Sequence, residues 1–152
     1  MLENKYQNHE IFFNLGSIEF QSNNLLEAIS YFERAKIIKL KNQEQIYTFL
    51  IYCYGKLKNY SKATELFHES LEKYPRSEKL IFTYAEIAKE KNNFQEFIRL
   101  YKEAISINPN NFQALSNLGA VYEKLKEFSN AIEIYKKAIE IAPDISHLKV
   151  DY

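Results

Sequence analysis

Residues 112–145 read FQALSNLGAVYEKLKEFSNAIEIYKKAIEIAPDI, and this stretch decides the fold. Apolar residues recur at helical spacing from Leu115 to Leu125 and again from Ala131 to Ile139. The polar pair Lys126-Glu127 separates the two series, and Pro143 follows the second. Because a proline disfavours helical angles at the residue before it, the stretch predicts two helices, a tight turn between them and a firm end.

The same pattern recurs along the chain with a period of 34 residues. The prolines at 75, 109 and 143 share this spacing, and so does an aromatic column at 67, 101 and 135. Polar turns fall at matching places, at Asn23-Asn24, Lys58-Asn59, Asn92-Asn93 and Lys126-Glu127, and asparagine tolerates the left-handed angles that such turns need. After the prolines, Ser77, Asn111 and Asp144 are expected to cap the next helices.

These repeats predict four helix pairs, over residues 9–42, 44–77, 78–111 and 112–145. Residues 1–8 are expected to form an N-terminal extension, and residues 146–152 a short C-terminal capping segment or truncated helix. One helix pair alone leaves its apolar face open, so stacked copies are required. Within the pairs, Gly16 and Gly119 are expected to face Ala28 and Ala131, which brings the two helices close together.

The residues of the last unit resemble the tetratricopeptide repeat (TPR) signature through Leu115, Leu118, Gly119, Tyr122, Ala131, Tyr135, Ala138 and Pro143. The first unit departs most, with Glu19 where Tyr54 and Tyr122 stand and Leu40 where the prolines stand. The resemblance implies an all-α fold, an α-α superhelix (solenoid) of four helix-turn-helix units. It further implies that the first helices line a concave groove, which in this family holds an extended peptide or a partner helix.

The family pattern also implies which side chains line that groove, namely those on the first helices that face away from the second. The resulting binding residues are Phe13, Asn14, Phe49, Tyr52, Lys79, Phe82, Thr83, Glu86, Gln113 and Asn117. Aromatic residues can supply the anchors that dominate binding, so Phe49 and Phe82 are expected to contact an apolar partner segment. The alternative is that these rings pack on one another or on neighbouring helices.

One TPR subclass grips the carboxylate tail of heat-shock chaperones with lysine, asparagine and arginine side chains. When the clamp positions of that subclass are mapped onto units one to three, they are occupied by Phe13, Ser17, Phe49, Lys79 and Thr83. Shifted by one unit, they hold Thr48, Tyr52, Thr83, Gln113 and Asn117. Only Lys79 matches, and a terminal carboxylate needs several converging cations. The sequence therefore argues against a chaperone carboxylate clamp.

The charge balance disfavours nucleic acid and membranes as partners. In 152 residues, 20 Lys and Arg offset 20 Asp and Glu, so no excess positive charge attracts phosphates or anionic lipids. The basic run at residues 36–41 is better explained as cations that offset a helix dipole than as an RNA contact. No apolar segment approaches the roughly 20 residues that cross a bilayer. With no signal peptide at Met1, a cytoplasmic protein is expected.

No catalytic, cofactor or metal site is expected. Glu65 and His68 share a helical face, but a carboxylate-bridged metal site needs a second such motif. Cys53 occupies the column of Ile18, Ile87 and Val121, which predicts a small buried residue. We therefore expect a non-catalytic protein-interaction scaffold. The alternative is a self-associating assembly subunit, a homo-oligomer formed through the incompletely capped C-terminal end of the solenoid.

Overall fold

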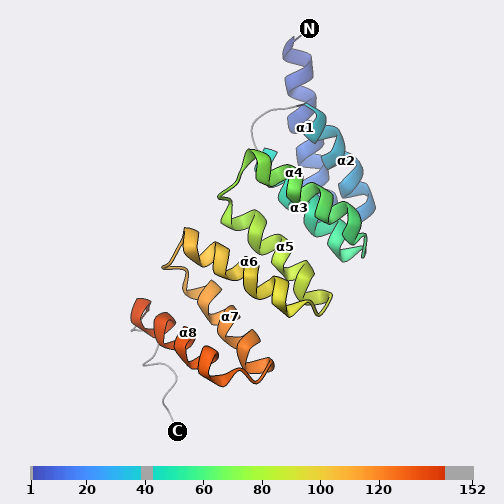
Figure 1. The fold of residues 1–152 in the computed structure, drawn as a ribbon. Coiled ribbons are helices and arrows are strands. Elements are labelled where there is room, and N and C mark those ends of the chain that lie inside the picture. The colour runs from blue at the N-terminus through green and yellow to red at the C-terminus, as the bar shows by residue number, and fades with distance from the viewer. Residues whose placement is uncertain (1, 39–42, 143–152) are drawn as a thin grey trace. The chain divides into compact units, whose positions relative to one another are not determined.

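The computed structural model describes residues 2–38 and 43–142, and every regular element within these two ranges is an α-helix (Figure 1). The helices are α1 (Leu2–Gln21), α2 (Leu25–Ile37), α3 (Gln43–Lys56), α4 (Tyr60–Lys73), α5 (Glu78–Glu90), α6 (Phe94–Ile107), α7 (Phe112–Lys124) and α8 (Phe128–Ile141). The predicted all-α fold is confirmed. The segment 1–8 is continuous with the first helix from Leu2 onward, while the predicted segment 146–152 lies outside the described residues.

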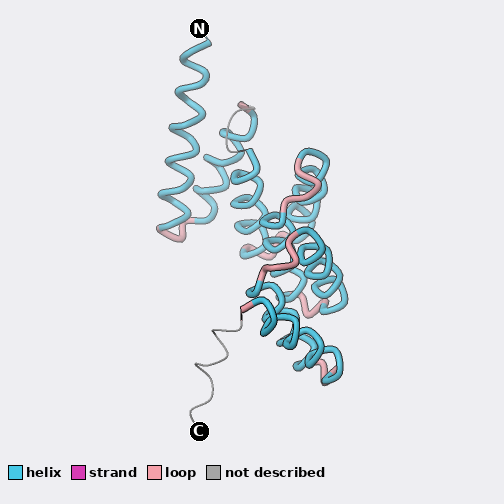
Figure 2. Tube along the Cα trace, turned by 90° about the vertical axis from the view of Figure 1, so that its left-hand side faces the viewer, coloured by secondary structure: helices cyan, strands magenta, loops and turns pink. Residues whose placement is uncertain are grey.

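The chain divides into two compact units, Met1–Ile87 and Ala88–Tyr152. Unit 1 contains α1 to α4 and most of α5, and unit 2 contains the end of α5 together with α6 to α8. Among the described residues, short loops join successive helices (Figure 2). The division of the chain into four repeats stays a prediction.

The turns from a first to a second helix share one backbone geometry. Asn23, Lys58, Asn92 and Lys126 all have φ between 57° and 61°, in the left-handed region. The next residue donates its N–H to a carbonyl five residues back, as Asn59 does to Tyr54 over 2.9 Å. These are the bonds of a Schellman motif, which satisfies the last carbonyls of a helix. The predicted polar turns are confirmed, and two of them place a lysine at the left-handed position.

The prolines and caps act as the sequence predicts. Tyr74 and Asn108, which precede Pro75 and Pro109, leave helical angles directly after α4 and α6. The Ser77 hydroxyl then accepts a hydrogen bond from the Leu80 N–H over 3.1 Å. The Asn111 side chain accepts one from the Ala114 N–H over 3.0 Å. Asp144, the third predicted cap, lies outside the described residues.

Each unit has its own apolar core. In unit 1, the fully buried side chains include Phe32, Tyr47 and Cys53, and burial raises the pKa of the Cys53 thiol to about 12. In unit 2, Leu100 and Leu118 are fully buried. Cys53 is therefore a core residue, as its column predicted.

At Gly16 and Gly119 of the first helices, the nearest side chains of the paired helices are aromatic rings. A methyl group added to Gly16 would lie 2.8 Å from Cδ1 of Phe32, and one added to Gly119 would lie 2.7 Å from Cε1 of Tyr135. The expectation that Ala28 and Ala131 also face these glycines stays a prediction. The space above each glycine is filled by an aromatic ring one helical turn further along.

Candidate functional site

The ten predicted binding residues fall on the first helices of both units. Gln113 and Asn117 lie on α7 in unit 2, and the other eight lie on α1, α3 and α5 in unit 1.

Four aromatic side chains of unit 1 form one continuous surface on α1 and α3. This aromatic face consists of Phe13, Phe20, Phe49 and Tyr52. The ring centroids of Phe20 and Phe49 lie 4.8 Å apart, those of Phe20 and Tyr52 5.3 Å apart, and those of Phe13 and Phe49 6.3 Å apart. Tyr52 is 41% exposed, and the three phenylalanines are half-buried. The structure thus brings together three predicted residues and adds Phe20, which the family pattern did not place here.

The ring of Phe49 packs on the core of unit 1. Its ring stacks on the fully buried ring of Phe32 in α2, with centroids 4.8 Å apart and planes at 11°. Of the two alternatives that the sequence left open for Phe49, packing on neighbouring rings is therefore shown. A contact with a ligand through its exposed side stays a prediction.

The predicted residues of α5 are mostly polar. Lys79 and Glu86 are exposed, Phe82 and Thr83 are half-buried, and the Thr83 hydroxyl donates to the Lys79 carbonyl over 2.8 Å. Lys79 also lines a polar hollow of about 370 Å³ at the N-terminal ends of α3 and α5. Its other lining residues are Gln43, Glu44, Gln45 and Tyr74. This hollow could admit small polar groups, but it offers no apolar pocket for an anchor.

In unit 2 the predicted residues are engaged with each other and with the preceding helix. The Gln113 amide donates to Asn117 over 3.0 Å, and the Asn117 amide donates to the Tyr101 hydroxyl over 3.2 Å. Asn117 thereby ties α7 to α6. The hollow described in this unit, of about 300 Å³, is lined largely from the second helices α6 and α8, with Lys102 and Lys137 at its edge.

A hydrogen-bonded network joins α2, α3 and α4. The Tyr47 hydroxyl donates to Glu69 over 2.6 Å and accepts from the Lys73 ammonium over 2.8 Å, while Lys36 donates to the second Glu69 oxygen over 3.3 Å. Burial and the Glu69 carboxylate raise the pKa of Tyr47 well above its usual value. The network holds a buried tyrosine in place. The polar side chains around Tyr47 thus have a structural role, as partners of its hydroxyl.

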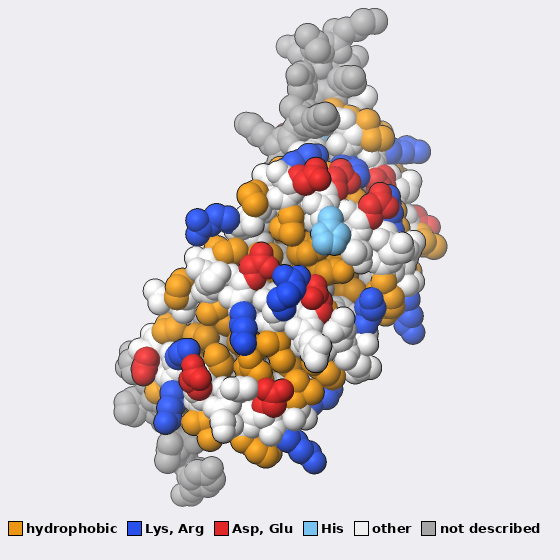
Figure 3. Space-filling model, viewed as in Figure 1, with side chains coloured by type: hydrophobic (Ala, Val, Ile, Leu, Met, Phe, Trp, Pro, Cys, Tyr) orange, Lys and Arg blue, Asp and Glu red, His pale blue; other side chains and the backbone are white. Residues whose placement is uncertain are grey.

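The described residues contain no group of three or more His, Cys, Asp or Glu side chains arranged to hold a metal ion. Glu65 pairs with Lys62 over 2.8 Å. On the face of the molecule in Figure 3, acidic and basic side chains are interspersed. Of the helices in residues 2–38 and 43–142, none is both long and apolar enough to cross a bilayer.

Solved structures similar to this chain include proteins described as tetratricopeptide repeat proteins. A crystal structure of MamA aligns with a TM-score of 0.78 at 17% identity, covering 96% of this chain and 85% of that one. A tetratricopeptide repeat protein from Parabacteroides merdae aligns with a TM-score of 0.78 at 16% identity, covering 90% and 54%. YrrB, described as a TPR protein with an unusual peptide-binding site, aligns with a TM-score of 0.68 at 20% identity, covering 88% and 68%. At these identities the likeness shows the fold alone. No curated protein matches the sequence.

Models of repeat families match most of the chain. Tetratricopeptide repeat models match residues 9–42 and 112–145, and a TPR repeat model matches residues 85–126. A PPR repeat model matches residues 45–74. The matches, the neighbouring folds and the paired helices agree. The chain belongs to the tetratricopeptide-repeat family.

Proposed function

We propose that this chain is a non-catalytic interaction scaffold that binds a peptide or partner helix on the first helices of unit 1. The observation that carries the proposal is the aromatic face on α1 and α3. Half-buried rings at such a surface supply the kind of anchor contact that dominates protein–protein binding. The fold family and the peptide-binding site described for YrrB support the same ligand class.

The aromatic face suits an apolar anchor. Its rings already pack on one another, with Phe49 fixed on Phe32, so little side-chain freedom is lost when a ligand covers them. On α5 of the same unit, Lys79 and Glu86 are exposed and carry one positive and one negative charge. A carboxylate tail needs several converging cations, so the preferred partner is an apolar segment with polar flanks and not a chaperone-type tail.

Selection from a displayed library of short random peptides against the full chain tests this proposal. We expect enriched peptides with aromatic or aliphatic anchors. Tyr52 is the best probe because it is 41% exposed, whereas the stacked Phe49 also supports the core. Tyr52→Ala should weaken binding roughly tenfold, in the range of a typical hot-spot residue. Tyr31→Ala, on the second helix α2, is the matched control and should change affinity less than about twofold.

Two results would refute this assignment of the site. One is a set of enriched peptides that binds Tyr52→Ala as tightly as the unaltered chain. The other is equal weakening by Tyr52→Ala and Tyr31→Ala, which would indicate loss of folding or a different surface.

The proposal includes a protein or peptide partner, no nucleic acid, no membrane and a cytoplasmic location. The PPR repeat match covers residues 45–74 only, and the chain carries no net charge. A protein that neutralises phosphates binds polyanions with a strong salt dependence. We therefore expect the chain to pass through a heparin column at moderate salt, and retention there would favour RNA.

A further inference from the structure

Inside the chain, each first helix packs on the second helix that precedes it, and the contact has a regular pattern. The Tyr84 ring of α5 stacks on the Phe67 ring of α4 with centroids 4.1 Å apart. The Phe49 ring of α3, one repeat position before that of Tyr84, stacks on Phe32 of α2 with centroids 4.8 Å apart. Phe32 and Phe67 occupy the aromatic column of the repeat, which continues to Tyr101 and Tyr135.

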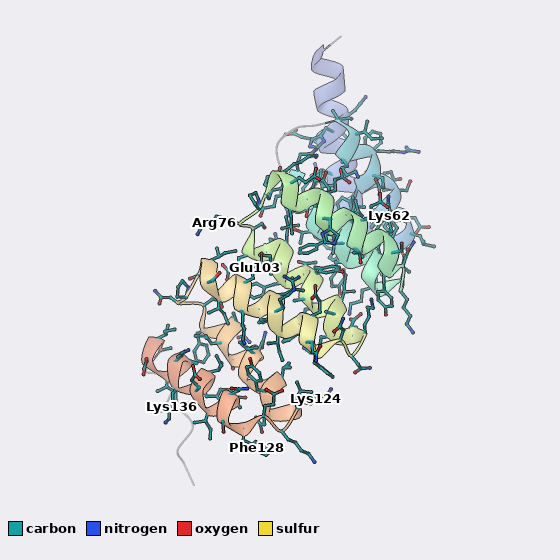
Figure 4. All side chains as sticks on the ribbon, in the orientation of Figure 1. Lys62, Arg76, Glu103, Lys124, Phe128 and Lys136 are labelled. Atoms are coloured by element: carbon teal, nitrogen blue, oxygen red, sulfur yellow. The ribbon has the colours of Figure 1, made fainter. Side chains whose placement is uncertain are left out.

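At α8 this contact surface is open among the described residues. Phe128, Ile132 and Ile139 are each more than half exposed, and Tyr135 is half-buried. We call these four residues, together with Lys136, the α8 face; Figure 4 labels Phe128 and Lys136 on it. Exposed apolar area of this extent marks a surface that another chain or segment covers.

At α1, the first-helix side of the same contact is exposed among the described residues. Ile11 and Ile18 are more than half exposed and Leu15 is half-buried. The residues at the same repeat positions in α3 are Ile46, Leu50 and Cys53, all fully buried. We call Ile11, Asn14, Leu15, Ile18 and Glu19 the α1 face.

We propose that the α8 face of one copy of this chain packs on the α1 face of a second copy. The α8 face corresponds to the second-helix side of the contact that recurs inside the chain, and the α1 face corresponds to the first-helix side. The two faces can therefore pack on each other. The repeat positions then fix which side chains meet. Two polar pairs, one on either side of the apolar residues, support a second copy as the occupant.

The first pair joins Tyr135 to Asn14 of the second copy. Tyr101 and Asn117 stand at the same repeat positions in α6 and α7, where the asparagine amide donates to the tyrosine hydroxyl over 3.2 Å. Asn14 is exposed within the chain, and the Tyr135 hydroxyl, which donates to Glu123 over 3.2 Å, can still accept from an amide. The residue types are identical in the two cases, so the contact between copies repeats a hydrogen bond that unit 2 already forms.

The second pair joins Lys136 to Glu19 of the second copy. At these positions α2 and α3 place Glu33 and Tyr54, whose side chains are hydrogen-bonded over 3.3 Å. The same positions in α6 and α7 hold a lysine 5.9 Å from a tyrosine ring centroid. Glu19 is the residue that departs from the family pattern; one of its carboxylate oxygens accepts from the Asn24 amide over 2.7 Å, and opposite Lys136 the carboxylate forms a pair of opposite charges. Such complementarity favours this partner and this orientation.

This contact uses different surfaces on the two copies, so each added copy leaves one α8 face and one α1 face free. Association of that kind continues beyond two copies unless a ring closes. The mass of the chain in solution should therefore rise steadily with concentration above the 18.0 kDa of the monomer.

Two single substitutions test the proposal by light scattering coupled to gel filtration. Ile132→Asp places a charge in the α8 face and leaves the α1 face intact, and Ile18→Asp does the reverse. We expect each variant alone to stay monomeric at concentrations where the unaltered chain associates. Mixed in equal amounts, the two variants should form a dimer of one copy each that grows no further. Leu26→Asp, at an exposed position on α2 outside both faces, is the control and should associate like the unaltered chain.

A strictly monomeric unaltered chain at high concentration would overturn the proposal, and so would self-association of Ile18→Asp alone, which would indicate a symmetric contact between two α8 faces. Charge reversal supplies a second test. Lys136→Glu and Glu19→Lys should each weaken association by roughly two- to fivefold, and combining both in one chain should restore it. Failure of the double variant to recover would count against the pairing. Tyr52→Ala, the probe of the aromatic face, should leave association unchanged, so the two proposals fail separately.

Discussion

Gly16→Ala and Gly119→Ala are the same substitution at equivalent repeat positions, yet the structure predicts different outcomes. In a helix interior, alanine is favoured over glycine by about 1 kcal/mol. Against this gain, the new methyl group meets an aromatic ring in both places. It would lie 2.8 Å from Cδ1 and Cε1 of Phe32 in one case, and 2.7 Å from Cε1 and 2.9 Å from Cζ of Tyr135 in the other.

The outcome depends on whether each ring can move. Phe32 is fully buried, stacks on Phe49 and has the Phe13 ring at 6.1 Å, so it has no free space to enter. Overpacking of such a core costs about 1–3 kcal/mol, which exceeds the helix gain. Tyr135 is half-buried on the open α8 face, so its ring has solvent on one side to move into, at the cost of the 3.2 Å hydrogen bond that its hydroxyl donates to Glu123. We therefore expect Gly16→Ala to destabilise the fold by about 1 kcal/mol and Gly119→Ala to be close to neutral.

Thermal and urea unfolding followed by far-UV circular dichroism measure the difference. For a chain of this size, 1 kcal/mol corresponds to a change in Tm of roughly 2–4 °C. In a Phe32→Leu background the penalty of Gly16→Ala should shrink, because the ring that meets the methyl group is gone. Equal shifts for the two alanine variants, or a more stable Gly16→Ala, would refute the reasoning that ring mobility decides the result.

Three further predictions follow from single residues. Lys58→Gly should stabilise the fold by about 0.5–1 kcal/mol in urea unfolding, because glycine accepts the left-handed angles that strain lysine. Burial raises the pKa of Glu69, but the hydrogen bond from Tyr47 and the charge of Lys36 outweigh it, so the net pKa is lowered. The stability it contributes is thus present above its unfolded pKa and lost as pH falls through the folded one, so the Tm values of Glu69→Gln and the unaltered chain should converge in acid. Burial raises the pKa of Cys53 to about 12, so thiol labelling at mildly alkaline pH should be slow in the folded chain and fast in denaturant.

The helix boundaries could be predicted from the sequence because they depend on local backbone chemistry. Pro75 and Pro109 act on the residue directly before them, and Asn23 and Asn92 tolerate the left-handed turn through their own side chains. Lys58 adopts the same turn without any such preference. At Lys58 the geometry of the repeat overrides the local propensity of lysine. Only the alignment of Lys58 with Asn23 and Asn92 in the repeat indicated this turn.

The partners of the small residues could not be predicted in the same way. A column of glycine and alanine shows that two helices approach closely, but it does not show which opposing side chain fills the gap. Long side chains on a helix lean toward its N-terminus, and the ring of Phe32, one turn after Ala28, is the side chain nearest to Gly16. The same direction brings Tyr135 over Gly119.

The predicted binding residues show a related effect. Asn14, Phe49, Thr83 and Asn117 share one repeat position, and the family pattern assigned all four to a groove. In α3 and α7, however, this position contacts the aromatic residue of the preceding second helix, through a ring stack for Phe49 and a hydrogen bond for Asn117. The position therefore lies where neighbouring helix pairs meet, so its side chain is shared between packing and binding. At Asn14, no second helix among the described residues precedes α1, and the side chain is exposed. Its amide can therefore donate to a tyrosine hydroxyl that a partner presents at the position of Tyr101. The contact with Tyr135 of a second copy follows from that chemistry.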